Sequence, residues 1–138
     1  MSATAVLDPM LCFAVYSAER RIGQVYRELL APHGLSYTQY LVLIALWEDG
    51  ELAVGRIGEL LGLDSGTLSP LLKRLEARGL LTRSRSARDE RMVAVALTET
   101  GLALRDELAD VPRCLGERLG TTREQAAALV QALGALVP

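Results

Sequence analysis

Two cysteines are the side chains of this 138-residue sequence with the most evident chemistry. Cys12 lies in the segment Leu-Cys-Phe-Ala-Val-Tyr at positions 11–16, and Cys114 lies far along the chain. Structural disulfides are rare in the cytosol, where the thiol pool keeps cysteines reduced. A sparse pair therefore indicates either inert packing in the core or redox chemistry, for which the thiolate is the reactive form.

Other catalytic or metal-binding chemistry has little support in the sequence. His33 is the only histidine and the acidic residues are scattered, so neither a metal site nor a catalytic triad can be assembled. We therefore predict no cofactor and no bound metal.

The composition predicts one mostly helical domain over residues 1–138. Half of the residues are hydrophobic, which is enough for a core, and aromatic residues make up only 4%. Abundant Leu, Ala, Glu and Arg favour helix over sheet. The initial Met-Ser-Ala-Thr lacks the features of a secretory signal, and no uncharged apolar run approaches the roughly 20 residues that span a bilayer. We expect a cytoplasmic protein without membrane contact.

The positive charge is concentrated in one segment. The whole chain carries −2, but residues 73–91 hold seven basic and three acidic residues, a net +4, so the remainder carries −6. A local basic patch on an acidic body suits phosphate binding, although a solvated charged loop explains the same run equally well. The basic residues are Lys73, Arg74, Arg78, Arg83, Arg85, Arg88 and Arg91.

The elements that must position these residues begin with a long N-terminal helix. Asp8 and Pro9 are predicted as its N-cap and first helical residue. Apolar residues recur at steps of four and three as far as Leu29, which favours packing against another helix, such as one from a second subunit. A capping-box pattern at 36–39 predicts a second helix from Tyr37 to about Trp47.

Two further helices form a predicted helix-turn-helix. They cover about 54–61 and 66–78, and the turn between them lies at 62–65. The second helix has an apolar face and an opposite face of small polar and basic residues. Pro70 removes an intrahelical hydrogen bond, and such local departures tend to mark functional places. The outer face holds Thr67, Ser69, Pro70, Lys73 and Arg74.

A basic hairpin is predicted directly after this helix. Strands at about 80–83 and 92–97 flank a polar tip at 84–90, which is the arrangement of a wing. A fifth helix is expected from 99 to about Leu119 with a bend at Pro112, and a capping box at 121–124 starts the last helix. The predicted fold class is mainly α with a small β-hairpin wing.

Several of these segments resemble the MarR family of winged-helix transcription regulators. They are Leu-Asp-Ser-Gly-Thr-Leu-Ser-Pro-Leu-Leu-Lys-Arg-Leu-Glu at 63–76, Gly-Leu at 79–80, Asp-Glu-Arg at 89–91 and Leu-Thr-Glu at 97–99. Within that family, residues 11–16, Tyr26 and the segment Leu-Ser-Tyr-Thr-Gln-Tyr at 35–40 resemble the OhrR branch of organic-hydroperoxide-sensing repressors. The likeness covers roughly residues 7 to 105.

The resemblance implies a homodimer on double-stranded DNA with a pseudo-palindromic operator. Residues 8–31 and 99–138 would be dimerisation helices, and residues 36–98 the winged helix-turn-helix, with the recognition helix at about 65–78 and the wing at about 81–97. Its DNA contacts would include Arg91, which Asp89 would orient by an ion pair. The implied DNA-binding residues are Ser65, Gly66, Thr67, Ser69, Pro70, Lys73, Arg74, Arg85, Arg88, Asp89 and Arg91.

The resemblance also implies that Cys12 reacts with peroxide, and that Tyr26 and Tyr37 of the partner subunit hydrogen-bond its sulfur. Within one straight helix, Cys12 and Tyr26 would lie about 21 Å apart, so their contact needs a fold-back or a partner. Tyrosine hydroxyls and the helix N-terminus would both favour the thiolate. Cys114 is then a candidate resolving cysteine, and a buried spectator thiol is the competing interpretation.

The predicted function is that of a repressor that binds DNA when reduced. Oxidation of Cys12 to a sulfenic acid, and its condensation with a thiol, would release the operator and derepress a peroxide-detoxifying gene. One alternative is a MarR-type regulator that responds to a small phenolic ligand in the dimer cleft. A thiol peroxidase is a weaker alternative, because it leaves the helix-turn-helix and the wing unexplained.

Overall fold

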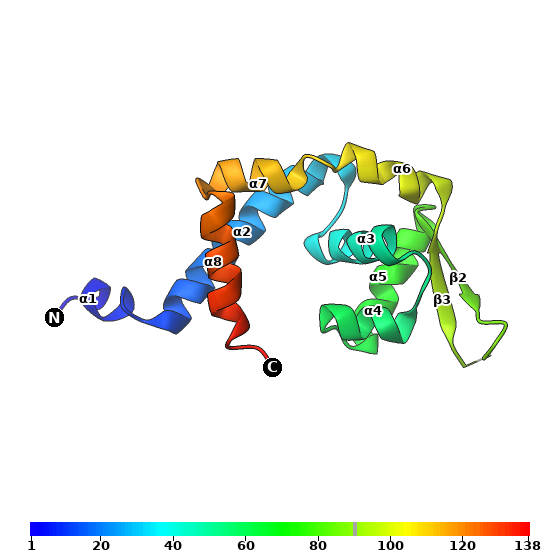
Figure 1. Ribbon diagram of the computed structural model, residues 1–138, viewed down its shortest axis with the longest axis horizontal. Helices are drawn as coiled ribbons and strands as arrows, with labels where there is room; N and C mark the ends of the chain where they lie inside the picture. The colour runs from blue at the N-terminus through cyan, green and yellow to red at the C-terminus, as the bar shows by residue number, and fades with distance from the viewer. Residues whose placement is uncertain (90) are drawn as a thin grey trace. The chain divides into compact units, whose positions relative to one another are not determined.

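The computed structural model describes residues 1–89 and 91–138 (Figure 1). Glu90, which the sequence analysis counts in the charged tip, lies outside the described residues. The chain divides into two compact units. Unit 1 joins residues 1–34 to residues 110–138, and unit 2 is residues 35–109. This boundary places residues 99–109 with the winged-helix segment, whereas the sequence analysis groups them with the dimerisation helices.

Helix α3 (Tyr37–Asp49) is the central buried helix of unit 2. Its predicted capping box is present: the Gln39 N–H donates to the Ser36 hydroxyl at 3.2 Å, and the Ser36 N–H donates to the Gln39 side chain at 3.0 Å. The helix runs two residues past the predicted end and stops at Gly50, whose φ of +76° favours glycine. Its core side chains are Tyr40, Val42, Leu43 and Leu46.

Helices α4 (Val54–Leu61) and α5 (Ser65–Ala77) follow as the helix-turn-helix. Gly62 ends α4 with a φ of +65°, where a side chain would strain the backbone. The Asp64 carboxylate caps α5 by accepting the Thr67 N–H at 2.7 Å. The apolar face of α5 is buried as expected, through Leu68, Leu71, Leu72 and Leu75.

The sheet has three antiparallel strands in the order β1-β3-β2: β1 (Leu52–Ala53), β2 (Leu81–Arg85) and β3 (Val93–Leu97). The hairpin of β2 and β3 projects from the helices, as a wing does (Figure 1). Strand β1 was not expected from the sequence. With only two residues, β1 has no alternation to detect, and it exists because it pairs with Val95 and Ala94.

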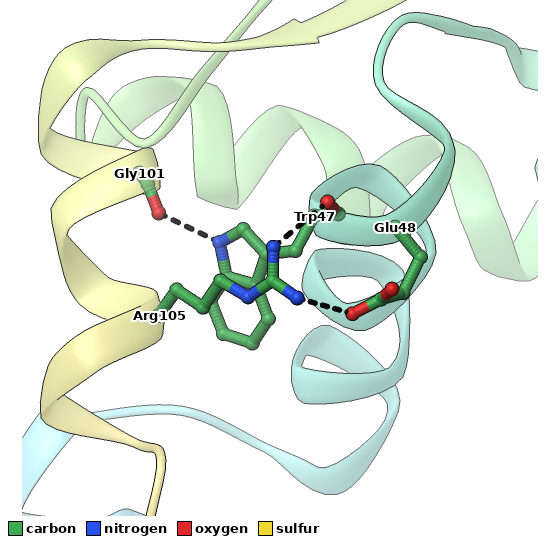
Figure 2. A network of polar contacts seen from close by, with 4 residues as sticks. All are labelled: Trp47, Glu48, Gly101 and Arg105. Carbon is green, nitrogen blue, oxygen red and sulfur yellow. Dashed lines mark hydrogen bonds and ion pairs between the residues drawn. The ribbon is translucent and has the colours of Figure 1, made fainter.

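Helix α6 (Glu99–Glu107) is joined to α3 by a polar network (Figure 2). The Trp47 indole N–H donates to the Gly101 carbonyl at 2.9 Å. The Arg105 guanidinium donates to the Trp47 carbonyl at 3.2 Å and pairs with Glu48 at 2.6 Å. Trp47, which the sequence places only near the end of a predicted helix, therefore holds the start of α6 against the end of α3.

The long helix predicted from 99 to 119 is wrong, because α6 and α7 (Val111–Leu119) are separate helices. The break precedes Pro112, which lies in the first turn of α7, where a missing N–H costs no intrahelical bond. The last helix, α8 (Arg123–Gly134), has its capping box at Thr122–Gln125, one residue later than predicted.

The predicted start of the N-terminal helix is also wrong. A short helix, α1 (Ala3–Leu7), comes first, because the Ser2 hydroxyl caps it by accepting the Ala5 N–H at 3.3 Å. Asp8 is the C-cap of α1 rather than the N-cap of the long helix. The long helix, α2 (Leu11–Leu30), begins after Met10 without a side-chain cap and continues into a 3-10 turn, η1 (Ala31–His33).

Helix α2 packs against α7 within unit 1. Arg118 of α7 forms an ion pair with Glu28 of α2, and this pair lowers the pKa of Glu28. The backbone carbonyl of Arg118 accepts a hydrogen bond from the Arg21 guanidinium at 3.4 Å.

Among the described residues, no single helix is long and apolar enough to cross a membrane. Leu11–His33 and Tyr37–Asp49, taken together as a bent pair, do meet the length and composition test.

Candidate nucleic-acid interface and cysteine site

The outer face of α5 is open to solvent along its whole length. Every predicted DNA-contacting residue of this helix is exposed: Ser65, Gly66, Thr67, Ser69, Pro70, Lys73 and Arg74. Small side chains gather at its N-terminal end, where the backbone N–H groups are also positive. The hydrogen bond from the Thr67 N–H lowers the pKa of Asp64, so the cap remains ionised. This face can approach a groove closely and offer hydroxyls to it.

Pro70 lies inside α5, beyond its first turn. Because proline lacks an N–H, the Gly66 carbonyl does not receive the usual bond from the residue four positions later. Both residues are exposed on the outer face. The face therefore offers a carbonyl oxygen beside the apolar proline ring, which suits contact with a base edge or a thymine methyl group.

The wing tip is ordered by its own backbone contacts. The Ser86 N–H donates to the Met92 carbonyl at 2.7 Å, and the Met92 N–H donates to the Asp89 carbonyl at 3.0 Å. The predicted partner of the Asp89 carboxylate was the Arg91 guanidinium, whereas the contact that the structure describes is with the Arg91 backbone N–H, at 3.0 Å. Arg85, Arg88, Asp89 and Arg91 are all exposed.

A contact between Glu76 and Arg83 in unit 2 was not expected from the sequence. The Glu76 carboxylate accepts both the backbone N–H of Arg83, at 2.9 Å, and its guanidinium, at 3.1 Å. These bonds lower the pKa of Glu76. In the sequence both residues stand out only as charges of the basic segment. The available signal was the acidic side chain in the last turn of α5, where the helix dipole disfavours it.

Cys12 lies in the first turn of α2, as a free and exposed thiol. Aromatic and basic side chains follow it on the helix: the Phe13 and Tyr16 rings are 6.4 Å apart, and the Arg20 guanidinium lies 5.5 Å from the Tyr16 ring. Cys12 is therefore not packed in the core of its own chain. The N-terminal turn supplies unpaired backbone N–H groups that favour an anion.

Cys114 belongs to α7 and is a free, half-buried thiol. Arg113 beside it pairs with Asp110 at 3.4 Å and with Glu117 at 2.8 Å. These carboxylates raise the pKa of Arg113, with the hydrogen bond to Asp110 the largest cause. Cys114 and Cys12 thus lie in the same compact unit, in α7 and α2, the two helices that pack together.

The two predicted tyrosines lie in different units. Tyr26 is half-buried on α2 in unit 1, and Tyr37 is exposed as the first residue of α3 in unit 2. Tyr26 follows Cys12 on the same continuous helix, so the two side chains of one chain are separated along its axis. A bond from Tyr26 to the Cys12 sulfur therefore calls for a second copy of the chain.

Unit 1 leaves many large apolar side chains uncovered. Helix α8 has no buried residue, and Leu11 of α2 and Val130 of α8 are 58% and 71% exposed. Clusters of this kind mark association surfaces in soluble proteins. The exposed side chains are Leu11, Phe13, Val15, Tyr16 and Ile22 on α2, and Leu129, Val130 and Leu133 on α8.

Comparisons with known proteins point the same way. Residues 24–108 match the family described as transcriptional regulator SarA/Rot. The chain is 48% identical over 130 residues to the HTH-type transcriptional regulator TtmR of Methylorubrum extorquens, which covers 94% of this chain and 67% of that protein. It is 44% identical over 130 residues to the organic hydroperoxide resistance transcriptional regulator of Bacillus subtilis, covering 94% and 86%.

Solved structures agree with the fold. The chain resembles reduced AbfR bound to DNA with a TM-score of 0.80 and 34% identity, over 98% of this chain and 97% of that one. It resembles a mutant MarR from E. coli complexed with operator DNA with a TM-score of 0.83 over the whole of both chains, but at 22% identity this likeness concerns the fold alone. The predicted class, a mainly helical winged helix-turn-helix, is confirmed.

Proposed function

Because the chain belongs to the MarR/SarA family of winged-helix transcriptional regulators, we propose that it is a homodimeric repressor that senses organic hydroperoxides through Cys12. In the reduced state α5 and the wing bind double-stranded operator DNA. Oxidation of Cys12 releases the operator and derepresses a peroxide-detoxifying gene.

The relatives support a redox-linked regulator rather than an enzyme. The Bacillus subtilis relative is an organic hydroperoxide resistance regulator. AbfR, at 33–34% identity, has been solved reduced on DNA, over-oxidised on DNA and with a disulfide formed. These are properties of those proteins, and they make a thiol-based switch the leading proposal for this chain.

The exposed Cys12 thiol on the N-terminal turn of α2 is the observation that carries the proposal. The surrounding apolar side chains are also exposed, so a second copy that covers them would place its own groups around the thiol. Tyr26 and Tyr37 of that second copy would then donate their hydroxyls to the sulfur and favour the thiolate.

The proposed chemistry is a two-step thiol oxidation. The Cys12 thiolate attacks the peroxide, so that an S–O bond forms, the O–O bond breaks and the alkoxide takes a proton to leave as an alcohol. The sulfenic acid then condenses with the Cys114 thiol of the second copy, which forms an S–S bond between the subunits and releases water. Either step changes the bonds that the Cys12 sulfur makes between the dimer helices. Operator half-sites lie about one helical turn apart, so a shift of a few ångströms between the recognition helices weakens binding.

Operator binding before and after oxidation tests the proposal. Reduced protein is titrated onto a duplex that it selects from a random-sequence pool, with and without cumene hydroperoxide, and dithiothreitol is then added back. We expect binding, loss of binding and recovery in that order. Binding that ignores the peroxide but is lost with a phenolic compound would point instead to a ligand-responsive regulator.

Arg91→Ala should weaken operator binding by about 1–3 kcal/mol, with a loss that depends on the DNA sequence, if the arginine enters a groove. Lys73→Ala, as a phosphate contact, should weaken binding to all sequences alike and reduce the salt dependence. Fluorescence anisotropy on the selected duplex and on a scrambled duplex, over a range of salt, separates the two. Unchanged affinity in both variants would place the DNA-binding surface elsewhere.

Cys114→Ser should prevent formation of a covalent dimer. Peroxide-treated wild type should run as a covalent dimer on non-reducing gels and give a Cys12–Cys114 peptide in mass spectrometry. The variant should run as a monomer on the same gel and over-oxidise beyond dithiothreitol rescue. A disulfide requires Cα atoms within about 7 Å. If wild type gives no such peptide, Cys114 is a spectator and the switch depends on Cys12 alone.

A further inference from the structure

Glu76 occupies a place where a carboxylate is electrostatically unfavourable. It lies in the last turn of α5, where unpaired backbone carbonyls make the helix end negative. A basic residue would be favoured there. A local conflict of this kind is retained when another contact offsets it. In this protein the offsetting contact is with Arg83 of β2.

One carboxylate holds both the main chain and the side chain of Arg83. Oε2 of Glu76 accepts the Arg83 backbone N–H at 2.9 Å, and Oε1 accepts the guanidinium at 3.1 Å. Among the residues that the structure describes, strand β2 lies at the edge of the sheet and pairs with β3 alone, so some of its N–H groups point away from the sheet and lack a strand partner. Glu76 supplies that partner at the middle residue of β2.

The arrangement is not the best one for stability. The Arg83 Nε is buried and has no hydrogen-bond partner among the described residues. A buried, unpaired donor is unfavourable, and each such group calls for an explanation. The side chains of Arg83 and Glu76 are only 28% and 37% exposed, so the pair is better shielded from water than an ordinary surface ion pair.

The pair lies between the two surfaces that face DNA in the proposed function. Lys73 and Arg74 precede Glu76 on α5, and Arg85 lies two residues beyond Arg83, on the same face of β2. The base of the wing is held by a hydrogen bond of its own, in which the Thr98 hydroxyl donates to the Gly79 carbonyl at 2.5 Å. The Glu76–Arg83 contact attaches the hairpin to α5 at a second point, farther along β2. Two points of attachment fix the direction of a hairpin better than one.

We infer that Glu76 and Arg83 are positioning residues for DNA binding, which fix the wing to α5 so that the wing arginines and the outer face of α5 engage one duplex together. The inference rests on the proposed DNA-binding function. Neither residue needs to contact DNA for this role; both act through Arg85, Arg88 and Arg91.

A double-mutant cycle tests the positioning role. If Glu76 positions the wing arginines, the losses of DNA-binding free energy in the Glu76 and Arg91 variants should not add, whereas a purely structural role would leave them additive. Glu76→Gln keeps the size of the side chain, Glu76→Ala removes it, and each is combined with Arg91→Ala. The reduced proteins are titrated onto the duplex that wild type selects. If Arg91→Ala lowers the DNA affinity of wild type about tenfold, it should lower the affinity of the Glu76 variants less than about threefold. In those variants the wing is no longer fixed to α5, so the Arg91 contact with DNA is already lost.

The salt dependence gives an independent readout. In the Glu76 variants the slope of log K against log salt should shrink by about 0.9 for each phosphate contact that the wing loses. Glu48→Gln is the matched control, because it removes the carboxylate of another glutamate–arginine pair in unit 2, on α3, and should change neither the cycle nor the slope (Figure 2).

The possible outcomes separate the two proposals. Two results would overturn the positioning role and leave the DNA-binding function intact. One is that the losses of binding free energy add and the salt slope is unchanged; the other is that both Glu76 variants bind DNA as wild type does. If wild type selects no duplex from the pool, the proposed function itself is wrong, and the positioning role falls with it.

Discussion

Replacing Cys12 with serine should leave a repressor that binds its operator normally and no longer responds to organic hydroperoxide. Serine has nearly the same size, and Cys12 is exposed in its own chain, so the substitution opens no cavity within the chain. The hydroxyl cannot form a sulfenic acid, so the coupling between oxidation and DNA affinity is lost. That coupling is typically 5- to 150-fold in affinity, and we expect a loss of about 100-fold in oxidised wild type and none in the variant.

Gel-shift titrations with and without cumene hydroperoxide measure this effect, with dithiothreitol reversal of wild type as the control for irreversible damage. Cys114→Ser is measured in parallel, because it keeps the reactive cysteine and removes only the proposed resolving one; unlike wild type, it should not recover with dithiothreitol. Release of Cys12→Ser at the oxidant dose that releases wild type would remove the redox proposal and favour a regulator that responds to a bound ligand.

Gly101→Ala should destabilise unit 2 by about 3 kcal/mol or more, at the upper end of the range for overpacking a well-packed core. A Cβ at this position would lie 2.0 Å from the carbonyl oxygen of Leu80 and 3.0 Å from a methyl carbon of Leu97. The Leu80 backbone cannot move away freely, because its carbonyl accepts the Thr98 N–H at 3.1 Å and its N–H donates to Leu75 at 3.1 Å. The Gly101 carbonyl also accepts from Trp47, so the start of α6 is held from both sides (Figure 2).

Thermal unfolding followed by circular dichroism, at fixed protein concentration, checks this prediction, and Tm should fall by about 10 °C or more. Gly55→Ala is the control. Gly55 lies in the first turn of α4 with nothing within 4 Å of the added methyl group, so alanine should not destabilise the helix and should add at most about 0.5–1 kcal/mol of stability. A Gly101→Ala protein as stable as wild type would mean that α6 does not pack against the Leu80 carbonyl.

Local patterns in the sequence determined much of the winged helix. The capping box at Ser36 and Gln39, the bounds of α4 and the buried leucines of α5 all follow from interactions between residues a few positions apart. Such signals are present in the chain before it folds. For the same reason the outer face of α5 was assigned correctly as exposed, and the hairpin was placed to within a few residues.

The cysteine site was predicted by residue type and family resemblance, and not by geometry. The sequence marks Cys12 as unusual and leaves inert packing open. The structure adds that the thiol is exposed, on a helix whose apolar neighbours are exposed too. Exposure depends on which surfaces the rest of the fold covers, so no local pattern reports it.

Contacts between distant residues account for what the sequence did not predict. Strand β1 exists only because β3 pairs with it, and the network of Trp47 with Gly101 joins helices far apart in the chain. The contact between Glu76 and Arg83 forms only when the end of α5 lies beside an edge strand whose N–H points away from the sheet. Hydrogen-bond partners of this kind are set by tertiary packing, because a side chain's distant neighbours are decided only when the elements come together.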